Sequence, residues 1–284
     1  MKRQKSFQNE LPTLFLVATP IGNLDEMTPR AIDVLSSVSV IAAEDTRKTL
    51  RLLQHFNIQT KLIAHHVHNE SESALGILKL LKNQQDVALV SDAGYPLISD
   101  PGAAVVQAVL DAGFNVVPIS GASAALDALI ASGLPAQPFL FYGFLPLQEK
   151  ECRQELNQLK VYPYTLVFYE APHRIKKTLE RILPIVGDRK AVLAREITKV
   201  FEEFIRGTIS ELIEVAEDLK GEIVLVIEGN INDREKAVDL TEIHQRIQIY
   251  IESGVSASQA IKQVAQEVGL SKNEVYASYH HKEH

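Results

Sequence analysis

The chain has 284 residues, of which 46% are apolar and 23% charged, and its formal net charge at pH 7 is -7. This apolar content is sufficient for folded cores and excludes a disordered or collagen-like chain, while the acidic balance excludes a uniformly basic coat for nucleic acid. No apolar run approaches the roughly 20 residues of a membrane-spanning helix, and the polar segment 6–10 stands where a signal peptide would be apolar. We therefore expect a soluble cytoplasmic protein with no membrane partner.

From residue 13 onward, short strand-like runs alternate with helix-like patterns. Alternation of this kind predicts an α/β domain whose parallel sheet carries helices on both faces. The predicted strands are 13–18, 38–43, 61–65, 87–90 and 116–119, and the predicted helices are 29–35, 47–55, 71–81, 103–110 and 122–131.

A second alternating block begins near Pro138. Its last two strands flank a helix at 209–216 and read less like a parallel series, so we expect a mixed sheet. The segment 132–138 is the expected hinge between the two domains. The predicted strands of this block are 139–144, 165–169, 191–194, 201–206 and 223–227.

The end of the chain is predicted to be helical. Two helix-like segments, 257–264 and 272–277, are joined by a turn in which Gly269 can end one helix and Ser271 can cap the next. This outline fits a nucleic-acid-binding helix-turn-helix and equally a small packing module. The expected organisation is a flexible N-terminus at 1–12, a parallel-sheet α/β domain at 13–132, a mixed-sheet α/β domain at 133–232 and a helical extension at 238–284.

Two loops at strand ends are candidates for a ligand site, because ligands of open parallel sheets bind beyond the carboxyl ends of the strands. The loop 91–102 (SDAGYPLISDPG) is longer than a simple connection needs and offers the carboxylate of Asp92. The next strand ends in 120–123 (SGAS), where free N–H groups at a helix start would receive a carboxylate or phosphate. The ordinary explanations are a turn-rich connection for the first loop and close helix packing for the second.

Charged residues also follow predicted strands. The segment 43–47 (AEDTR) offers Glu44 and Arg47 to a substrate, although Asp45 is equally suited to cap the following helix. In the second block, the segment 168–174 (FYEAPHR) is either ordinary surface or one wall of a cleft that faces the first domain.

Several common sites are missing from the sequence. It contains no dinucleotide-binding fingerprint, no phosphate-binding P-loop motif and no nucleophilic serine elbow. His66 and His68 lack a third ligand at a suitable spacing, so we expect no metal. The single Cys152 stands in a charged helical run and is expected on a helix surface. No partner histidine is visible for it, which argues against thiol catalysis.

Six motifs follow one another in the order in which one known family has them. They resemble the methyltransferases that modify a cytidine ribose 2′-oxygen in small-subunit ribosomal RNA, within the tetrapyrrole methylase superfamily. The resemblance runs from about residue 13 to residue 229, and the tail is similar to that family's helical extension. The sequence departs at Tyr95, where the family usually has threonine, and at 120–123, where it has PGPS. The motifs are 19–24 (TPIGNL), 43–47 (AEDTR), 91–102 (SDAGYPLISDPG), 132–135 (SGLP), 143–146 (GFLP) and 168–174 (FYEAPHR).

The resemblance implies two α/β domains with S-adenosylmethionine bound in the cleft between them. It also implies that the methyl acceptor is the ribose 2′-hydroxyl of a cytidine in the decoding centre of 16S RNA, presented by the small ribosomal subunit, and that the protein is a homodimer. The candidate cofactor-binding residues are Pro20, Asp92, Ala93, Gly94, Ile98, Ser120, Gly121, Ala122 and Ser123.

The acceptor hydroxyl is a weak acid, so a base should receive its proton as the methyl group arrives. The candidate bases are Glu44, Asp45, His68 and Glu170, and Lys199 is a candidate for orienting the ribose or a phosphate. RNA affinity has to come from local positive charge, for which the candidates are Arg47, Arg174, Lys262 and Lys272.

Two other functions stay open. One keeps the chemistry but methylates a tetrapyrrole or another small metabolite, as other members of the superfamily do. The other is a non-catalytic regulator that binds nucleic acid through its tail, which would leave the loops of the first domain without a role.

Overall fold

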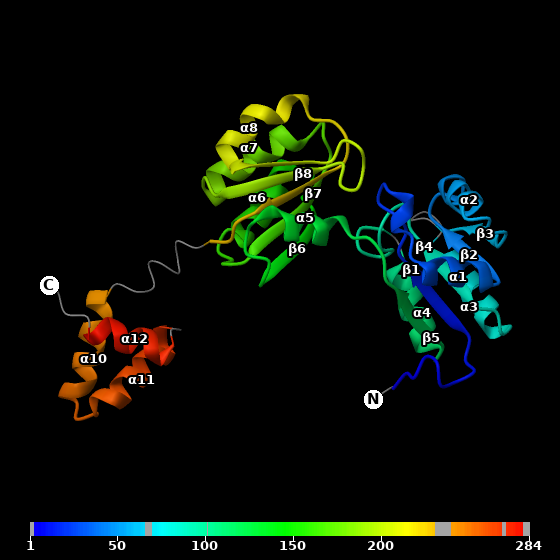
Figure 1. Ribbon diagram of the computed structural model, residues 1–284. Helices are drawn as coiled ribbons and strands as arrows, with labels where there is room; N and C mark the ends of the chain where they lie inside the picture. The colour runs from blue at the N-terminus through cyan, green and yellow to red at the C-terminus, as the bar shows by residue number, and fades with distance from the viewer. Residues whose placement is uncertain (1–2, 66–69, 101, 231–239, 269–270, 281–284) are drawn as a thin grey trace.

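The computed structural model describes residues 3–65, 70–100, 102–230, 240–268 and 271–280, and within them it has two five-stranded sheets (Figure 1). The first sheet has the order β3-β2-β4-β1-β5, and all of its pairings are parallel. The predicted parallel sheet is therefore confirmed. Its strands are β1 (Thr13–Val17), β2 (Val40–Ala43), β3 (Lys61–Ala64), β4 (Val87–Val90) and β5 (Asn115–Ile119).

Helices cover both faces of the first sheet. The first of them begins at Pro29, and the hydroxyl of Thr28 caps it by accepting a hydrogen bond from the Ala31 N–H at 3.2 Å. The buried residues of α1 and α2 pack on one face, and those of α3 and α4 pack on the other. The helices are η1 (Leu24–Glu26), α1 (Pro29–Ser37), α2 (Thr46–His55), α3 (Glu70–Lys82) and α4 (Ala103–Asp111).

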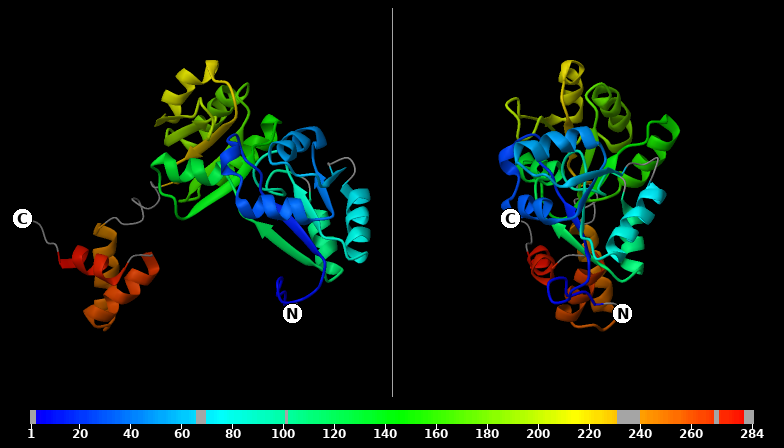
Figure 2. Two further views of the ribbon diagram at one scale, coloured as in Figure 1. Left: turned by 45° about the vertical axis from the view of Figure 1, so that its right-hand side comes forward. Right: turned by 90° about the vertical axis from the view of Figure 1, so that its right-hand side faces the viewer.

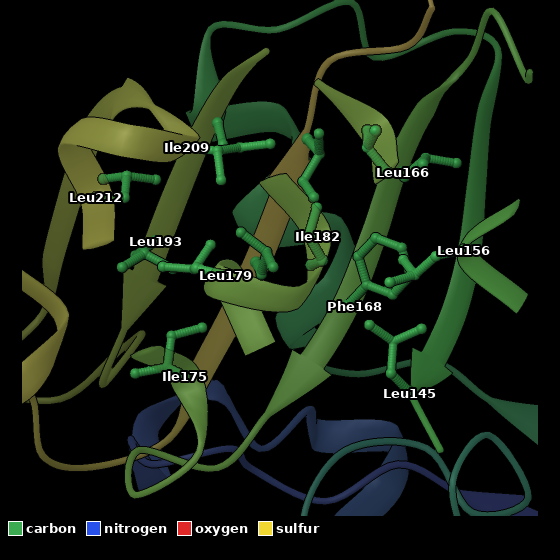
Figure 3. Close-up of a cluster of buried hydrophobic side chains, with 14 of the residues drawn as sticks. Leu145, Leu156, Leu166, Phe168, Ile175, Leu179, Ile182, Leu193, Ile209 and Leu212 are labelled. Carbon is green, nitrogen blue, oxygen red and sulfur yellow. The ribbon is translucent and has the colours of Figure 1, made fainter. Parts of the chain in front are cut away.

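The second sheet has the order β6-β7-β10-β8-β9, with β6 parallel to β7 and the other pairs antiparallel. This confirms the predicted mixed sheet. One face is covered by helices whose apolar side chains form one buried cluster with residues of the strands, among them Phe168 and Leu193 (Figure 3). The elements are β6 (Phe139–Phe144), α6 (Glu149–Leu159), β7 (Thr165–Glu170), α7 (Ile175–Val186), β8 (Lys190–Arg195), β9 (Glu203–Thr208), α8 (Ile209–Val215), η3 (Ala216–Asp218) and β10 (Ile223–Ile227).

The expected surface position of Cys152 is wrong, because its side chain is 2% exposed in the core of the second sheet. Leu156 and Leu159 follow it at spacings of four and seven residues, so the three share the buried face of α6. The charged neighbours that suggested a surface lie on the outer face of the same helix, where the Arg153–Glu149 ion pair is exposed.

The other face of the second sheet is covered by α5 (Ala124–Ser132), which follows β5 of the first sheet in the chain (Figure 1). Ala128 and Leu129 pack against apolar residues of β7, β8 and β10. Arg206 of β9 holds the end of this helix, with its guanidinium donating to the Ala131 carbonyl at 2.6 Å and the Ser132 carbonyl at 3.2 Å. The proposed domain boundary after residue 132 stays a prediction.

The C-terminal helices are α10 (Leu240–Glu252), α11 (Ala257–Val268) and α12 (Lys272–His280) (Figure 2). They bury a cluster of their own that contains Ile247, Ile261 and Val275. Helices are therefore present where the sequence predicted them, whereas Gly269 of the predicted turn lies outside the described residues. None of the helices in the described ranges is long and apolar enough to cross a membrane.

Candidate active site between the two sheets

A cavity of about 410 Å³ lies between the loops at the carboxyl end of the first sheet and the strands of the second. This is the edge at which open parallel sheets bind ligands. From the first half it is lined by Ile21, Asp92, Ala93, Gly94, Tyr95, Ile98, Ser99, Asp100, Ser123 and Ala124, and from the second by Phe144, Tyr169, Glu170, Ala171, Pro172, Ile197, Glu222, Ile223 and Val224.

The structure brings together five of the nine candidate cofactor residues at this cavity, namely Asp92, Ala93, Gly94, Ile98 and Ser123. Pro20 lines a neighbouring cavity of about 250 Å³ that adjoins the first at Asp92. A third, more open cavity of about 670 Å³ is lined by the remaining three candidates, Ser120, Gly121 and Ala122.

The loop after β4 is held in place by a two-way backbone pairing. The Thr19 N–H donates to the Gly94 carbonyl at 2.9 Å, and the Gly94 N–H donates back to the Thr19 carbonyl at 3.0 Å. Gly94 adopts a φ of +72°, which glycine reaches without a steric penalty. The Ser91 hydroxyl donates to the carbonyls of Ala93 and Gly94 at 3.3 and 3.2 Å, so the loop is fixed before any ligand arrives.

The segment before α5 differs from its prediction, because backbone N–H groups expected to be free have partners. The Gly121 N–H donates to the Tyr95 hydroxyl at 3.2 Å, and the Ala125 N–H donates to the Tyr169 hydroxyl. A side chain at Gly121 would lie 2.9 Å from the Ala18 Cβ, so close packing explains this glycine. Burial raises the pKa of Tyr169, which keeps its phenol neutral at the cavity wall.

Three carboxylates gather beside the loop after β4. Asp92 accepts from the Asp45 N–H at 3.1 Å and from the Lys48 ammonium at 2.7 Å. Burial, and then the negative charges of Asp100 and Asp92, raise the pKa of Glu44. Burial and the Asp92 charge likewise raise the pKa of Asp100. A group of this kind attracts a cation and can accept a proton.

Asp45 and Arg47 form an ion pair with each other. The Asp45 carboxylate caps α2 by accepting from the Arg47 N–H at 2.9 Å, and the Arg47 guanidinium donates to it at 2.8 and 3.1 Å. These hydrogen bonds hold the pKa of Asp45 far below its usual range, which makes it a poor base. The Arg47 side chain is nevertheless 87% exposed and remains accessible to a polyanion.

Lys199 reaches back over the loop after β1. Its ammonium lies 2.9 Å from both the Glu196 and the Glu222 carboxylates, and a side chain at Gly22 would meet its Cγ at 2.5 Å. Burial acts to lower the pKa of Lys199, but the hydrogen bonds with these two carboxylates outweigh it and raise the pKa. Lys199 therefore stays charged, as an orienting role requires.

Glu170 has ordinary partners for both carboxylate oxygens. Oε1 accepts from the Ala171 N–H at 2.8 Å and lies 3.3 Å from the Arg174 Nε, while Oε2 accepts from the Thr178 hydroxyl at 2.6 Å. Its side chain is 1% exposed. Glu170 thus touches the cavity wall but is occupied in holding the start of α7, and Arg174 is occupied with it.

Three further predicted residues are His68, Lys262 and Lys272. His68 is outside the described residues, and Lys262 and Lys272 are exposed on α11 and α12. Tyr169 belongs to the segment 168–174 that was offered as a cleft wall, whereas sequence reasoning missed Phe144 and Val224, which line the cavity from β6 and β10. Alternation along these strands was the available signal, but it does not tell which face meets the first sheet. No group of three or more potential metal ligands occurs among the residues that the structure describes.

The sequence is similar to that of known methyltransferases. The family model described as Tetrapyrrole (Corrin/Porphyrin) Methylases matches residues 13–213. A protein of Bacillus subtilis named ribosomal RNA small subunit methyltransferase I is 48% identical over 100% of both chains. The protein of that name in Escherichia coli O157:H7 is 43% identical over 97% of both.

Solved structures share the fold at low sequence identity. A uroporphyrin-III C-methyltransferase from Thermus thermophilus, solved as a complex with S-adenosylhomocysteine, has a TM-score of 0.55 at 19% identity, covering 78% of this chain and 99% of that one. A diphthine synthase has a TM-score of 0.59 at 12% identity, covering 76% and 89%.

Proposed function

This chain belongs to the tetrapyrrole methylase family, and from that premise we propose that it is an S-adenosylmethionine-dependent methyltransferase acting on ribosomal RNA of the small subunit. The finer proposal is that it methylates the ribose 2′-oxygen of a cytidine in the decoding centre of 16S RNA. The observation that carries the proposal is the full-length similarity to proteins named as small-subunit methyltransferases, joined to a cavity at the family's expected position.

The cavity fits the cofactor in size and in chemistry. Its 410 Å³ lies within the range of roughly 300–1,000 Å³ that is usual for sites of small ligands. Ile21, Ile197 and Val224 supply an apolar surface for the adenine, and the fixed loop after β4 supplies main-chain groups for the polar parts. Asp100 adds a carboxylate opposite a cofactor that carries net positive charge.

S-adenosylmethionine supplies a methyl group that is bonded to a positively charged sulfur. After the transfer, this sulfur is part of a neutral thioether, S-adenosylhomocysteine. The residues of this chain align the acceptor oxygen with that methyl carbon and exclude water. As the O–CH₃ bond forms and the C–S bond breaks, the hydroxyl proton has to pass to a base. We assign this role to Glu44, because its carboxylate accepts a hydrogen bond from the backbone N–H of Asp92, which lines the cavity, and because its raised pKa makes it a better proton acceptor than Asp45.

Lowering the pH should weaken cofactor binding. Burial and then the Asp92 charge raise the pKa of Asp100, so this carboxyl takes up a proton at a higher pH than an ordinary aspartate. Protonation removes its attraction for a cationic ligand, so the affinity is full well above the raised pKa and falls as the pH drops through it. Calorimetric titration with S-adenosylmethionine from neutral to mildly acidic pH measures this dependence. An equally steep dependence in Asp100→Asn would contradict the assignment.

Methyl transfer to defined substrates tests the function itself. The full-length protein is incubated with methyl-labelled S-adenosylmethionine and with small ribosomal subunits, free 16S RNA or uroporphyrinogen. We expect label in the subunit RNA, at one cytidine and on its ribose when the RNA is digested and mapped. Label in uroporphyrinogen alone would favour the metabolite methyltransferase, and binding to RNA without transfer would favour the regulator.

We also propose a homodimer in the cytoplasm. Exposed apolar side chains support the dimer: Ile130 of α5 is 72% exposed, and Val200 and Phe201 in the neighbouring loop are 94% and 71% exposed. Contact with a second copy would remove these side chains from water. Sedimentation equilibrium of the protein measures the mass, and a monomeric mass at micromolar concentration would contradict it.

A further inference from the structure

A cavity of about 250 Å³, here called the α2 pocket, lies beside the main one and contains the candidate cofactor residues Pro20 and Asp92. It shares Asp92 with the main cavity, so the two adjoin at one side chain. The loop after β1 forms one wall and α2 forms the other. The α2 pocket is lined by Thr19, Pro20, Gly22, Leu24, Lys48, Thr49, Arg51, Leu52, Ser91 and Asp92.

The side chains that line the α2 pocket include two cations and one carboxylate, although the net charge of the protein is -7. Lys48 and Arg51 are three residues apart on α2 and therefore lie on the same side of the helix. The Lys48 ammonium is 2.7 Å from the Asp92 carboxylate, whereas within the described part of the chain Arg51 has no ion-pair partner. Two cations thus face a single carboxylate among the described lining residues, and Arg51 provides the unmatched charge.

The structure of the methyl acceptor indicates which anion would bind in the α2 pocket. In RNA, the carbon that bears the 2′-oxygen is bonded to the carbon that bears a phosphodiester. A ribose whose 2′-oxygen points at the methyl donor therefore carries a phosphate group only a few bonds away. A pocket that adjoins the donor cavity and is lined by two cations is well placed to receive such a phosphate.

We propose that the α2 pocket binds the RNA phosphodiester next to the acceptor ribose, with Arg51 as the main contact and Lys48 as the second. This inference rests on the proposed function. The guanidinium presents paired N–H donors that match two phosphate oxygens, and the Lys48 ammonium keeps its charge because the hydrogen bond with Asp92 raises its pKa. Gly22 belongs to the opposite wall of the pocket.

The test compares Arg51→Glu with Arg153→Glu in the full-length protein. Arg153 is a matched control, since it is an arginine on an exposed helix face, 67% accessible and paired with Glu149. We expect Arg51→Glu to weaken binding to small subunits by at least about tenfold, the usual order for a lost charge-assisted contact. The slope of log affinity against log salt should fall by about one. The affinity for S-adenosylmethionine should match that of Arg153→Glu.

The outcomes separate this inference from the proposed function. If the wild type transfers methyl groups to small subunits and Arg51→Glu equals Arg153→Glu in affinity and salt slope, the phosphate assignment is overturned while the function stands. Equal losses of cofactor and subunit affinity would also overturn it, because the α2 pocket would then belong to the donor site. If the wild type instead methylates uroporphyrinogen and Arg51→Glu impairs that reaction, the pocket binds carboxylates and both proposals fall.

Discussion

Replacing Gly94 by valine should weaken the binding of S-adenosylmethionine about a hundredfold. A β-branched residue at the φ of +72° is strongly strained. The valine strains the backbone by roughly 3 kcal/mol. To relieve this strain, the loop has to give up the backbone hydrogen bonds between Gly94 and Thr19. The competent conformation then falls to about 1% of the population, and the apparent affinity falls with it.

Gly113→Val provides the control for this prediction. Gly113 has a φ of +85°, but no atom lies within 4 Å of a side chain built there, and it is in the turn between α4 and β5. Both variants should lose folding stability, and calorimetric titration should show a lost cofactor affinity in Gly94→Val alone. Equal affinities in the two variants would mean that the loop after β4 does not shape the cofactor site.

Replacing Glu170 by alanine should lower the free energy of unfolding by about 3 kcal/mol. The substitution leaves the Thr178 hydroxyl and the Ala171 N–H without their acceptor and leaves the Arg174 guanidinium, 21% exposed, without its counter-charge. Denaturant titration measures the loss. Glu203→Ala is the matched control, because it removes the partner of Arg195 from a more exposed ion pair and should cost less than about 1 kcal/mol.

Glu170→Gln separates this structural role from a catalytic one. An amide has the same shape and retains an acceptor oxygen, so we expect methyl transfer by this variant to stay within about threefold of the wild type. A general base replaced by its amide loses roughly a hundredfold or more in rate. A loss of that size in a stable Glu170→Gln protein would return Glu170 to the list of bases.

The fold was predictable where the pattern is local. The alternation of apolar strands and amphipathic helices locates β1 to β5 within two residues at each end, because buried parallel strands are continuous apolar runs. The sequence also predicted the loop after β4 as a ligand site, because this loop is long and rich in small residues and directly follows a buried apolar strand. The resemblance to known methyltransferases supplied the cofactor, which the pattern does not indicate.

The parts that were not predictable depend on partners distant in the sequence. The Gly121 N–H looked free because the Tyr95 hydroxyl that accepts from it lies 26 residues earlier. Glu170 stays a candidate base, but the sequence does not show that its carboxylate accepts a hydrogen bond from Thr178 of the following helix. Local pattern shows which groups are polar, but the tertiary fold decides which of them are already satisfied.

The packing of α5 determines where the chain can be divided. Although α5 follows β5 of the first sheet in the chain, it packs against one face of the second sheet. The Arg206 side chain donates hydrogen bonds to the last carbonyls of this helix. A fragment cut after Ser132 would expose the apolar side of this helix to water, and the complementary piece would have one bare sheet face. When the two halves are expressed separately, or exchanged between related enzymes, the junction should therefore lie before Ala124. The helix α5 then stays in the same fragment as the sheet that it covers.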